Sequence, residues 1–128
     1  MIIRVYYEDT DSGGVVYHSN YLNFMERART EWLRHLGINQ YDLKLKDNIM
    51  FVVANLDIKY KKSAMLDDEL RIETELVNIK ACSMQLLQNI YRDNELLTSS
   101  NVAIACVDAI KFKPIKIPTY IKKLMETL

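Results

Sequence analysis

The sequence predicts an α+β fold in which one long helix packs against an antiparallel sheet. Apolar residues recur at helical spacing, without a break, between Asn20 and Gly37. From Phe51 the apolar pattern changes to a period of two, which returns in the segment that begins near Glu69. Two further strand-like segments follow, set off by turn residues, and the last is rich in Val, Ile, Ala and Cys. These segments are joined by short polar links, which favour antiparallel pairing because parallel strands need a long crossover. A sheet covered by one helix is therefore expected.

Length and composition limit the possible classes of protein. The chain has 128 residues, 49% of them hydrophobic, which fits one domain spanning residues 1–128. Lys plus Arg and Asp plus Glu number 17 each, so no net charge attracts nucleic acid or anionic lipid. No apolar run approaches the roughly 18 residues of a membrane span, and the first residues lack the apolar core of a signal peptide. We therefore expect a cytoplasmic protein without a membrane span.

The two cysteines, Cys82 and Cys106, are interpreted as small buried residues in a reducing compartment. They lack the CxxC spacing of redox and metal sites, and no histidine cluster lies near them. We expect neither a metal site nor a cofactor.

The first elements of the chain are a strand, a glycine-containing turn and the long helix. Residues 2–7 are mostly β-branched or aromatic, which is typical of a strand. The turn-rich run that follows contains Gly13–Gly14, where the backbone can adopt conformations closed to other residues. Ser19 or Asn20 is expected to cap the helix and Gly37 to end it. The residues expected on its apolar face are Tyr21, Met25, Ala28, Trp32 and Leu36, with Leu22 and Leu33 beside them.

After the helix, the pattern predicts four strands and a terminal helix. Residues 38–48 are polar and suggest a solvated loop or a short helix. Strands are expected at about residues 51–60, 69–77, 82–91 and 97–110, followed by a short helix that Pro118 starts. The inward face of the first of these strands is expected to carry Val52, Ala54, Leu56, Ile58 and Tyr60.

One helix cannot cover a sheet of this size, so a second copy of the chain is expected to cover the rest. Val53, Val77 and the apolar stretch from Val102 to Val107 are the candidates for that surface. We therefore expect a homodimer or a homotetramer.

The run from Tyr7 to Tyr21, followed by Phe24 to Arg29, resembles the signature of hotdog-fold acyl-CoA thioesterases of the hydroxybenzoyl-CoA thioesterase superfamily. Within that superfamily the chain is most similar to the bacterial Tol–Pal-associated group, because Asp67 to Leu70 and Cys106 to Asp108 also match stretches of that group. The resemblance implies a hotdog fold, with a long central helix wrapped by an antiparallel sheet. It also implies dimers whose sheets join, active sites at the dimer interface, and hydrolysis of acyl-CoA to free acid and CoA.

The resemblance assigns roles to residues of the turn-rich run. The catalytic carboxylate matches Asp11, as nucleophile or general base, and the backbone N–H that polarises the carbonyl falls on His18. Gly14, Val15 and Tyr17 are expected to bind substrate beside them. From the residues alone, Asp11 can also be read as a turn residue and His18 as a structural histidine that braces the loop.

Thioester hydrolysis needs the two functions that this run offers. A base or nucleophile must lie beside the carbonyl carbon, and hydrogen-bond donors must face the oxygen that becomes negative. One well-placed donor is typically worth about 3 to 4 kcal/mol. Serine-based hydrolysis is not favoured, because the G-x-S-x-G elbow is missing and Ser12 and Ser19 are better read as turn and cap residues.

Two basic clusters offer partners for the phosphates of CoA. The first, which we assign to substrate binding, is Lys59, Lys61 and Lys62; the second is Lys111, Lys113 and Lys116. Solvated surface is the alternative role for these lysines. Two further functions stay open: a thioesterase that acts on acyl carrier protein, and a non-catalytic acyl-thioester-binding protein of the cell envelope machinery.

Overall fold

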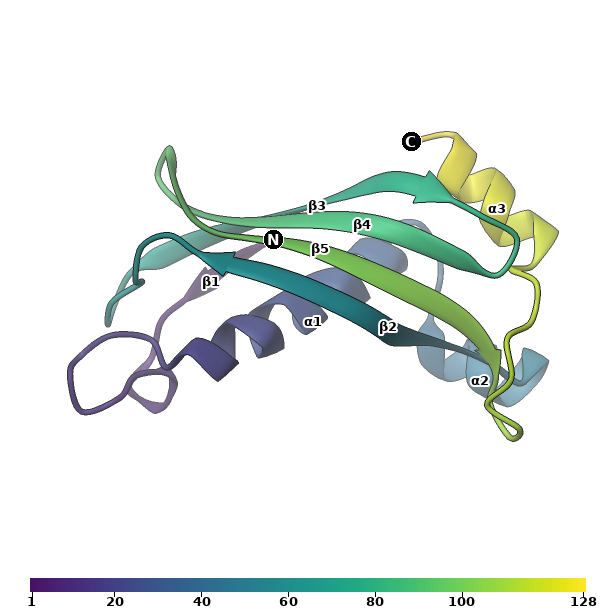
Figure 1. The fold of residues 1–128 in the computed structure, drawn as a ribbon, viewed down its shortest axis with the longest axis horizontal. Coiled ribbons are helices and arrows are strands. Elements are labelled where there is room, and N and C mark those ends of the chain that lie inside the picture. Colours follow the sequence, from purple (N-terminus) through teal and green to yellow (C-terminus); the bar gives the residue numbers. More distant parts are fainter.

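A computed structural model describes all residues from 1 to 128, and it contains one five-stranded sheet curved over a long helix (Figure 1). The strand order is β1-β3-β4-β5-β2, and every pair is antiparallel. The predicted α+β fold is therefore confirmed. The elements are β1 (Ile2–Arg4), the 3-10 turn η1 (Tyr7–Asp9), α1 (His18–His35), α2 (Gln40–Asp47), β2 (Ile49–Tyr60), β3 (Glu69–Ile79), β4 (Ser83–Arg92), β5 (Glu95–Asp108) and α3 (Thr119–Glu126).

The long helix α1 lies along the concave face of the sheet, as the apolar spacing predicted (Figure 1). Its fully buried side chains are Tyr21, Phe24, Met25, Ala28 and Leu33, whereas Trp32 and Leu36 are partly buried and Leu22 is exposed. Burying one large apolar side chain stabilises the fold by about 1.5 to 3 kcal/mol, so this face is the main attachment of the helix.

The end of α1 follows the prediction. Gly37 has φ of 88°, and its N–H donates to Arg34 O while Ile38 N–H donates to Leu33 O, both at 2.9 Å. These two bonds close the helix and satisfy carbonyl groups that a helix end leaves without partners.

The start of α1 differs from the prediction. The helix begins at His18 with Tyr17 as the flanking residue, and no side chain caps it, so a cap at Ser19 or Asn20 was wrong. The reason is that Tyr17 N–H is held by Asp9 O at 3.0 Å, which brings the chain directly into the helix. The Asn20 side chain donates to the same carbonyl at 2.9 Å and so braces the loop.

The first strand is also shorter than predicted. β1 pairs with β3 only over residues 2–4. Val5 N–H donates to Asp68 O at 2.9 Å, and the chain then turns through η1. Residues 5–7 are therefore a connection that leads toward the loop before α1.

Strand β2 has a bulge that corrects the predicted inward face. Between Val53 and Asn55, β2 advances by two residues while β5 advances by one, so Ala54 is an extra residue. A one-residue insertion exchanges the two faces of a strand. Leu56 and Ile58 face α1 as predicted, but Val52 points away from it and Phe51 packs against the core. Ala54 is exposed rather than inward.

Two apolar clusters fill the space between the helices and the sheet. The first surrounds the front half of α1, and the second joins the end of α1 to α2 and α3. The polar side chain of Gln88, which is fully buried, stands on β4 between Leu86 of the second cluster and Ile90 of the first. It accepts from Arg29 Nη1 at 2.9 Å and donates to Met25 O and Thr74 Oγ1, both at 3.0 Å.

The predicted surface for a second copy is only partly available. Val102, Ile104 and Cys106 are buried against the helices of the same chain, so the stretch from Val102 to Val107 was a wrong assignment. Val53 and Val77 are exposed by 46% and 54%. Burial raises the pKa of the Cys106 thiol to about 11, which agrees with its reading as a core residue.

None of the helices is both long enough and apolar enough to cross a bilayer.

Candidate active site

The loop before α1 forms a small hairpin that presents Asp11. Thr10 and Val16 form an isolated antiparallel bridge, and Asp11 N–H donates to Val15 O at 2.9 Å. Gly14 completes the turn, with its N–H directed at Asp11 O at 3.2 Å and φ of 82°. A residue with a side chain is strained at that φ, so the turn requires glycine here.

The Asp11 carboxylate has one engaged oxygen and one free oxygen. Oδ1 accepts from Gly13 N–H at 2.8 Å, which is the turn role that the sequence left open. A Cβ on Gly13 would lie 3.2 Å from the same oxygen, so a side chain at position 13 would require this carboxylate to shift slightly. No protein donor contacts Oδ2. The structural role and a chemical role are therefore compatible in one side chain.

The uncapped start of α1 leaves backbone donors free. The N–H groups of His18 and Ser19 have no acceptor within the protein, since the cap residue supplies none and the first helical bonds begin later. Free N–H groups and the helix dipole together favour a negative charge at this point.

Aromatic side chains pack around the start of α1. The His18 ring lies 5.0 Å from the Tyr17 ring and 5.8 Å from the Tyr60 ring, measured between centroids. Tyr60 Oη donates to His18 O at 3.2 Å, which ties the end of β2 to the first turn of the helix. Tyr21 is buried beside them, and its Oη accepts from Ala64 N–H at 2.9 Å. Burial raises the pKa of Tyr21, so the phenol stays protonated at neutral pH.

These elements enclose a cleft of about 370 Å³ beside the hairpin. The cleft is lined by Asp11, Val15, Val16, His18, Tyr21, Tyr60, Lys61, Lys62 and Ser63. Five residues assigned to the site from the sequence therefore meet in one place: Asp11, Val15, His18, Lys61 and Lys62.

Three of the assigned residues lie outside this cleft. Gly14 shapes the turn without lining the cleft, and Tyr17 is half exposed and covers one side of His18. Lys59 pairs with Ser99 on the face of the sheet that points away from α1. The second lysine cluster follows β5, near α2, at the opposite end of the sheet from the hairpin (Figure 1).

Sequence reasoning missed three residues of the cleft and underestimated a fourth. Val16, Tyr60 and Ser63 were not assigned to the site, although the alternation in β2 did place Tyr60 on the inward face at the strand end. Tyr21 was assigned to the apolar face of the helix, and the structure also makes it a wall of the cleft. Ser63 carries no sequence signal.

A second cavity, of about 350 Å³, lies between the middle of α1 and the edge strand β2. It is mostly apolar, with Trp32, Phe51 and Val53 in its lining, and it also contacts Arg29. It contains neither the Asp11 carboxylate nor the free N–H groups of the helix start. Of these two cavities, only the cleft at the hairpin is lined by Asp11 and His18.

Neither cavity offers an evident metal site. Nowhere do three His, Cys, Asp or Glu side chains gather in an arrangement that could hold a metal ion.

Comparisons with known proteins point to one family. A family model described as the thioesterase-like superfamily matches residues 5–125. The acyl-CoA thioesterase YbgC of Haemophilus influenzae is 47% identical over 120 residues, which cover 94% of this chain and 88% of the relative. The acyl-CoA thioester hydrolase YbgC of Escherichia coli is 45% identical over 117 residues, covering 91% and 87%. The crystal structure of a probable thioesterase from Bartonella henselae superposes with a TM-score of 0.88 at 34% identity, covering 92% and 97%.

Proposed function

The chain belongs to the thioesterase-like superfamily with the hotdog fold, and from this premise we propose that it hydrolyses acyl-CoA thioesters to the free acid and CoA. The observation that carries the proposal is that Asp11, with its free carboxylate oxygen, and His18, whose N–H group at the start of α1 has no acceptor, line one cleft. A base or nucleophile and an oxyanion site are the two requirements of acyl transfer from a thioester.

In the proposed reaction the thioester carbonyl oxygen accepts from His18 N–H, with Ser19 N–H and the helix dipole adding to the positive potential. Asp11 Oδ2 then either attacks the carbonyl carbon or removes a proton from a water that attacks it. The carbon–sulfur bond breaks, and CoA leaves as a thiolate that takes up a proton. In the first route water afterwards opens the mixed anhydride on Asp11.

The proposal is tested by measuring thiol release from a panel of acyl-CoAs that differ in chain length and aromatic character. Hydrolysis of at least one member at a turnover typical of enzymes, about 1 per second or faster, would support it. Tight binding of acyl-CoA without turnover would instead support the non-catalytic alternative. Presenting the same acyl chain on CoA and on an acyl carrier protein separates the two enzymatic alternatives.

We further propose that Lys61 binds a phosphate of CoA. It lines the cleft and no ion pair holds its side chain, whereas Lys62 Nζ is already 2.6 Å from Glu95 Oε2. Replacing Lys61 with Gln should raise KM for acyl-CoA by about fivefold. An exposed ion pair typically contributes up to about 1 kcal/mol of binding free energy, which corresponds to that change in affinity. KM for a short thioester without the nucleotide should stay unchanged, since only remote binding is lost.

Lys59→Gln is the matched control for this prediction. Lys59 lies two residues away in the same strand region but on the other face of the sheet. Equal effects of the two substitutions, or equal effects on both substrates, would contradict a specific phosphate contact at Lys61.

We also propose a homodimer in which the edge strand β2 joins its copy. β2 has 12 residues and pairs with β5 on one side only, which leaves a row of N–H and C=O groups without partners. Val53 adds an exposed apolar side chain to that edge. Light scattering at micromolar concentration should therefore give twice the monomer mass.

Two matched valine substitutions test which surface joins the copies. Val53→Asp should weaken the dimer, whereas Val77→Asp should leave it intact, because Val77 is similarly exposed but lies on β3. A stable wild-type monomer would contradict the dimer, and dissociation by Val77→Asp alone would place the interface on β3.

A further inference from the structure

The segment of residues 61–65 is the wall of the cleft on which the Asp11 hairpin rests. Val16 N–H donates to Ala64 O at 2.9 Å, and Val15 forms an isolated bridge with Met65. Ala64 N–H donates to Tyr21 Oη at 2.9 Å, so the same segment also contacts α1 near its N-terminal end. A shift of this segment would therefore move the hairpin relative to the helix start.

This segment belongs to no helix or strand, and its position depends on contacts from other elements. Lys61 N–H and Lys62 N–H both donate to Leu97 O, at 2.8 and 3.1 Å. Beyond Lys62 the chain leaves the sheet until β3 begins. Residues 63–65 must therefore be held from outside the sheet ladder.

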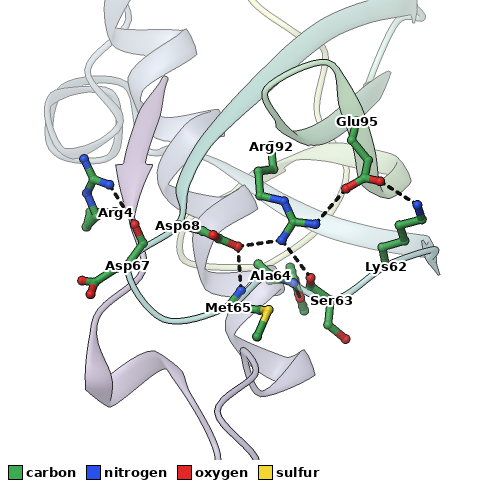
Figure 2. A network of polar contacts seen from close by, with 10 residues as sticks. Arg4, Lys62, Ser63, Ala64, Met65, Asp67, Asp68, Arg92 and Glu95 are labelled. Carbon is green, nitrogen blue, oxygen red and sulfur yellow. Dashed lines mark hydrogen bonds and ion pairs between the residues drawn. The ribbon is translucent and has the colours of Figure 1, made fainter.

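Arg92, the last residue of β4, holds this part of the chain (Figure 2). Its Nη1 lies 2.8 Å from Asp68 Oδ2 and 3.4 Å from Ser63 O. Asp68 Oδ2 in turn accepts from Met65 N–H at 2.8 Å. One guanidinium thus contacts the segment directly at Ser63 and through Asp68 at Met65.

A second arm of the network reaches Lys62. Arg92 Nη2 is 2.7 Å from Glu95 Oε1, and the other oxygen of Glu95 is 2.6 Å from Lys62 Nζ (Figure 2). Hydrogen bonds from Lys62 and then Arg92 lower the pKa of Glu95, so this carboxylate stays charged at neutral pH. Hydrogen bonds to Asp68 and Glu95 raise the pKa of Arg92.

The Arg92–Asp68 pair at the centre of the network is more enclosed than the other ion pairs of the chain. The side chains of Arg92 and Asp68 are 28% and 21% exposed, against 50% and 58% for Arg4 and Glu69. Exposed pairs contribute little, whereas a planar guanidinium that serves several acceptors fixes their relative geometry. Lysine lacks that fork and cannot serve all three acceptors in the same way.

We propose that Arg92 is a positioning residue for thioester hydrolysis, which holds residues 63–65 so that the hairpin places Asp11 opposite the N–H groups of α1. The proposal rests on the function proposed above. Arg92 does not touch the reacting atoms; it acts through Ser63, through Asp68 and Met65, and then through the contacts of Ala64 with Val16 and Tyr21.

The test compares Arg92→Gln with Arg4→Gln. Arg4 is a matched control because its Nη1 binds a backbone carbonyl of the same connection, Asp67 O at 2.8 Å (Figure 2), and its Nη2 binds Glu69. Neither Arg4 nor Asp67 lines the cleft. Arg92→Gln should lower kcat between about tenfold and a hundredfold with KM nearly unchanged, because a misplacement of about 1 Å has effects of that size. Arg4→Gln should keep kcat, and Arg92→Lys should recover part of the loss.

Amide hydrogen exchange tests whether Arg92 holds residues 63–65, without relying on activity. In Arg92→Gln the amides of Val16 and Ala64 should exchange at least about tenfold faster than in the wild type, while amides of the central strands β4 and β5 keep their rates. Arg4→Gln should not change the exchange of Val16. All variants are compared at a temperature below the lowest melting midpoint.

The outcomes separate this inference from the proposed function. Unchanged exchange at Val16 and Ala64 in Arg92→Gln, or an unchanged kcat, would overturn the positioning role while wild-type hydrolysis still stood. Equal losses of kcat in Arg92→Gln and Arg4→Gln would also overturn it, because the effect would then be general loosening of the connection. A wild type that hydrolyses no thioester would remove the proposed function, and the exchange rates alone would then decide whether Arg92 holds the segment.

Discussion

Replacing Asp11 with asparagine is expected to remove most of the thioesterase turnover and leave the fold intact. The loss in kcat should be at least about 100-fold and up to about 10,000-fold, the range of general acid–base catalysis. The amide can still accept from Gly13 N–H as Asp11 Oδ1 does at 2.8 Å, so the turn is preserved. Only the negative charge on the free oxygen is lost. Thiol release under saturating acyl-CoA measures the effect.

Asp9→Asn is the matched control for Asp11→Asn. Asp9 lies two residues earlier in the same loop, and its Oδ2 accepts from Tyr6 N–H at 2.9 Å, but it does not line the cleft. The control variant should keep a kcat near that of the wild type. If Asp11→Asn, shown to be folded, retains near-native turnover, both the nucleophile and the general-base versions of the mechanism are wrong.

A single turnover in ¹⁸O-labelled water distinguishes the two versions. Direct attack by water puts the label in the released acid, whereas opening of an anhydride at the Asp11 carboxyl carbon leaves the label in the protein. Label in the acid alone also fits an anhydride that opens at the substrate carbonyl. Chemical trapping of the acylated Asp11 separates that case from direct attack.

The second large effect is expected on stability, from Gln88→Ala. Gln88 is fully buried, and two of its three hydrogen bonds join it to α1 while the third joins it to Thr74 on β3. Its loss opens a cavity and removes the acceptor of Arg29, whose pKa burial already lowers, with Glu26 acting in the opposite direction. We expect the free energy of unfolding to fall by about 3 to 4 kcal/mol, measured by chemical denaturation.

Gln85→Ala is the matched control, because Gln85 is on the same strand but on its outer face, opposite Asn78. It should cost less than about 1 kcal/mol. A double replacement, Gln88→Met with Arg29→Met, should lower the free energy of unfolding by less than the sum of the two single replacements. In the double variant neither side chain remains buried without its hydrogen-bond partner. A Gln88→Ala loss no larger than that of Gln85→Ala would show that the contact contributes little to stability.

The local signals of the sequence were sufficient for most of the elements. The helical period predicted α1, the period of two predicted β2 and β3, turn residues and composition predicted β4 and β5, and Pro118 marked the start of α3. Gly37 was correctly read as the end of α1. These features depend on residues within a few positions of one another, so a pattern read along the chain contains the information.

The errors occurred where a distant residue changes a local preference. Asn20 is a good cap by composition, but Asp9 O binds its side chain and the helix begins earlier. The alternation in β2 is regular in sequence, but the pairing with β5 inserts Ala54 as a bulge and exchanges the faces before it. Register is set by the partner strand, and no periodicity within β2 reports it.

The sequence by itself determined the order of elements, the single long helix, and the run that carries Asp11 and His18. Only the tertiary structure decided which lysines share their cleft, that the N–H groups of the helix start are free, and that Arg92 holds the wall behind them. The reason is the distance along the chain: Arg92 contacts Ser63 and Asp68 across 29 and 24 positions, and the hairpin rests on Ala64. Contacts of that span follow from strand pairing and packing, whereas helix period and turn chemistry are written in neighbouring residues.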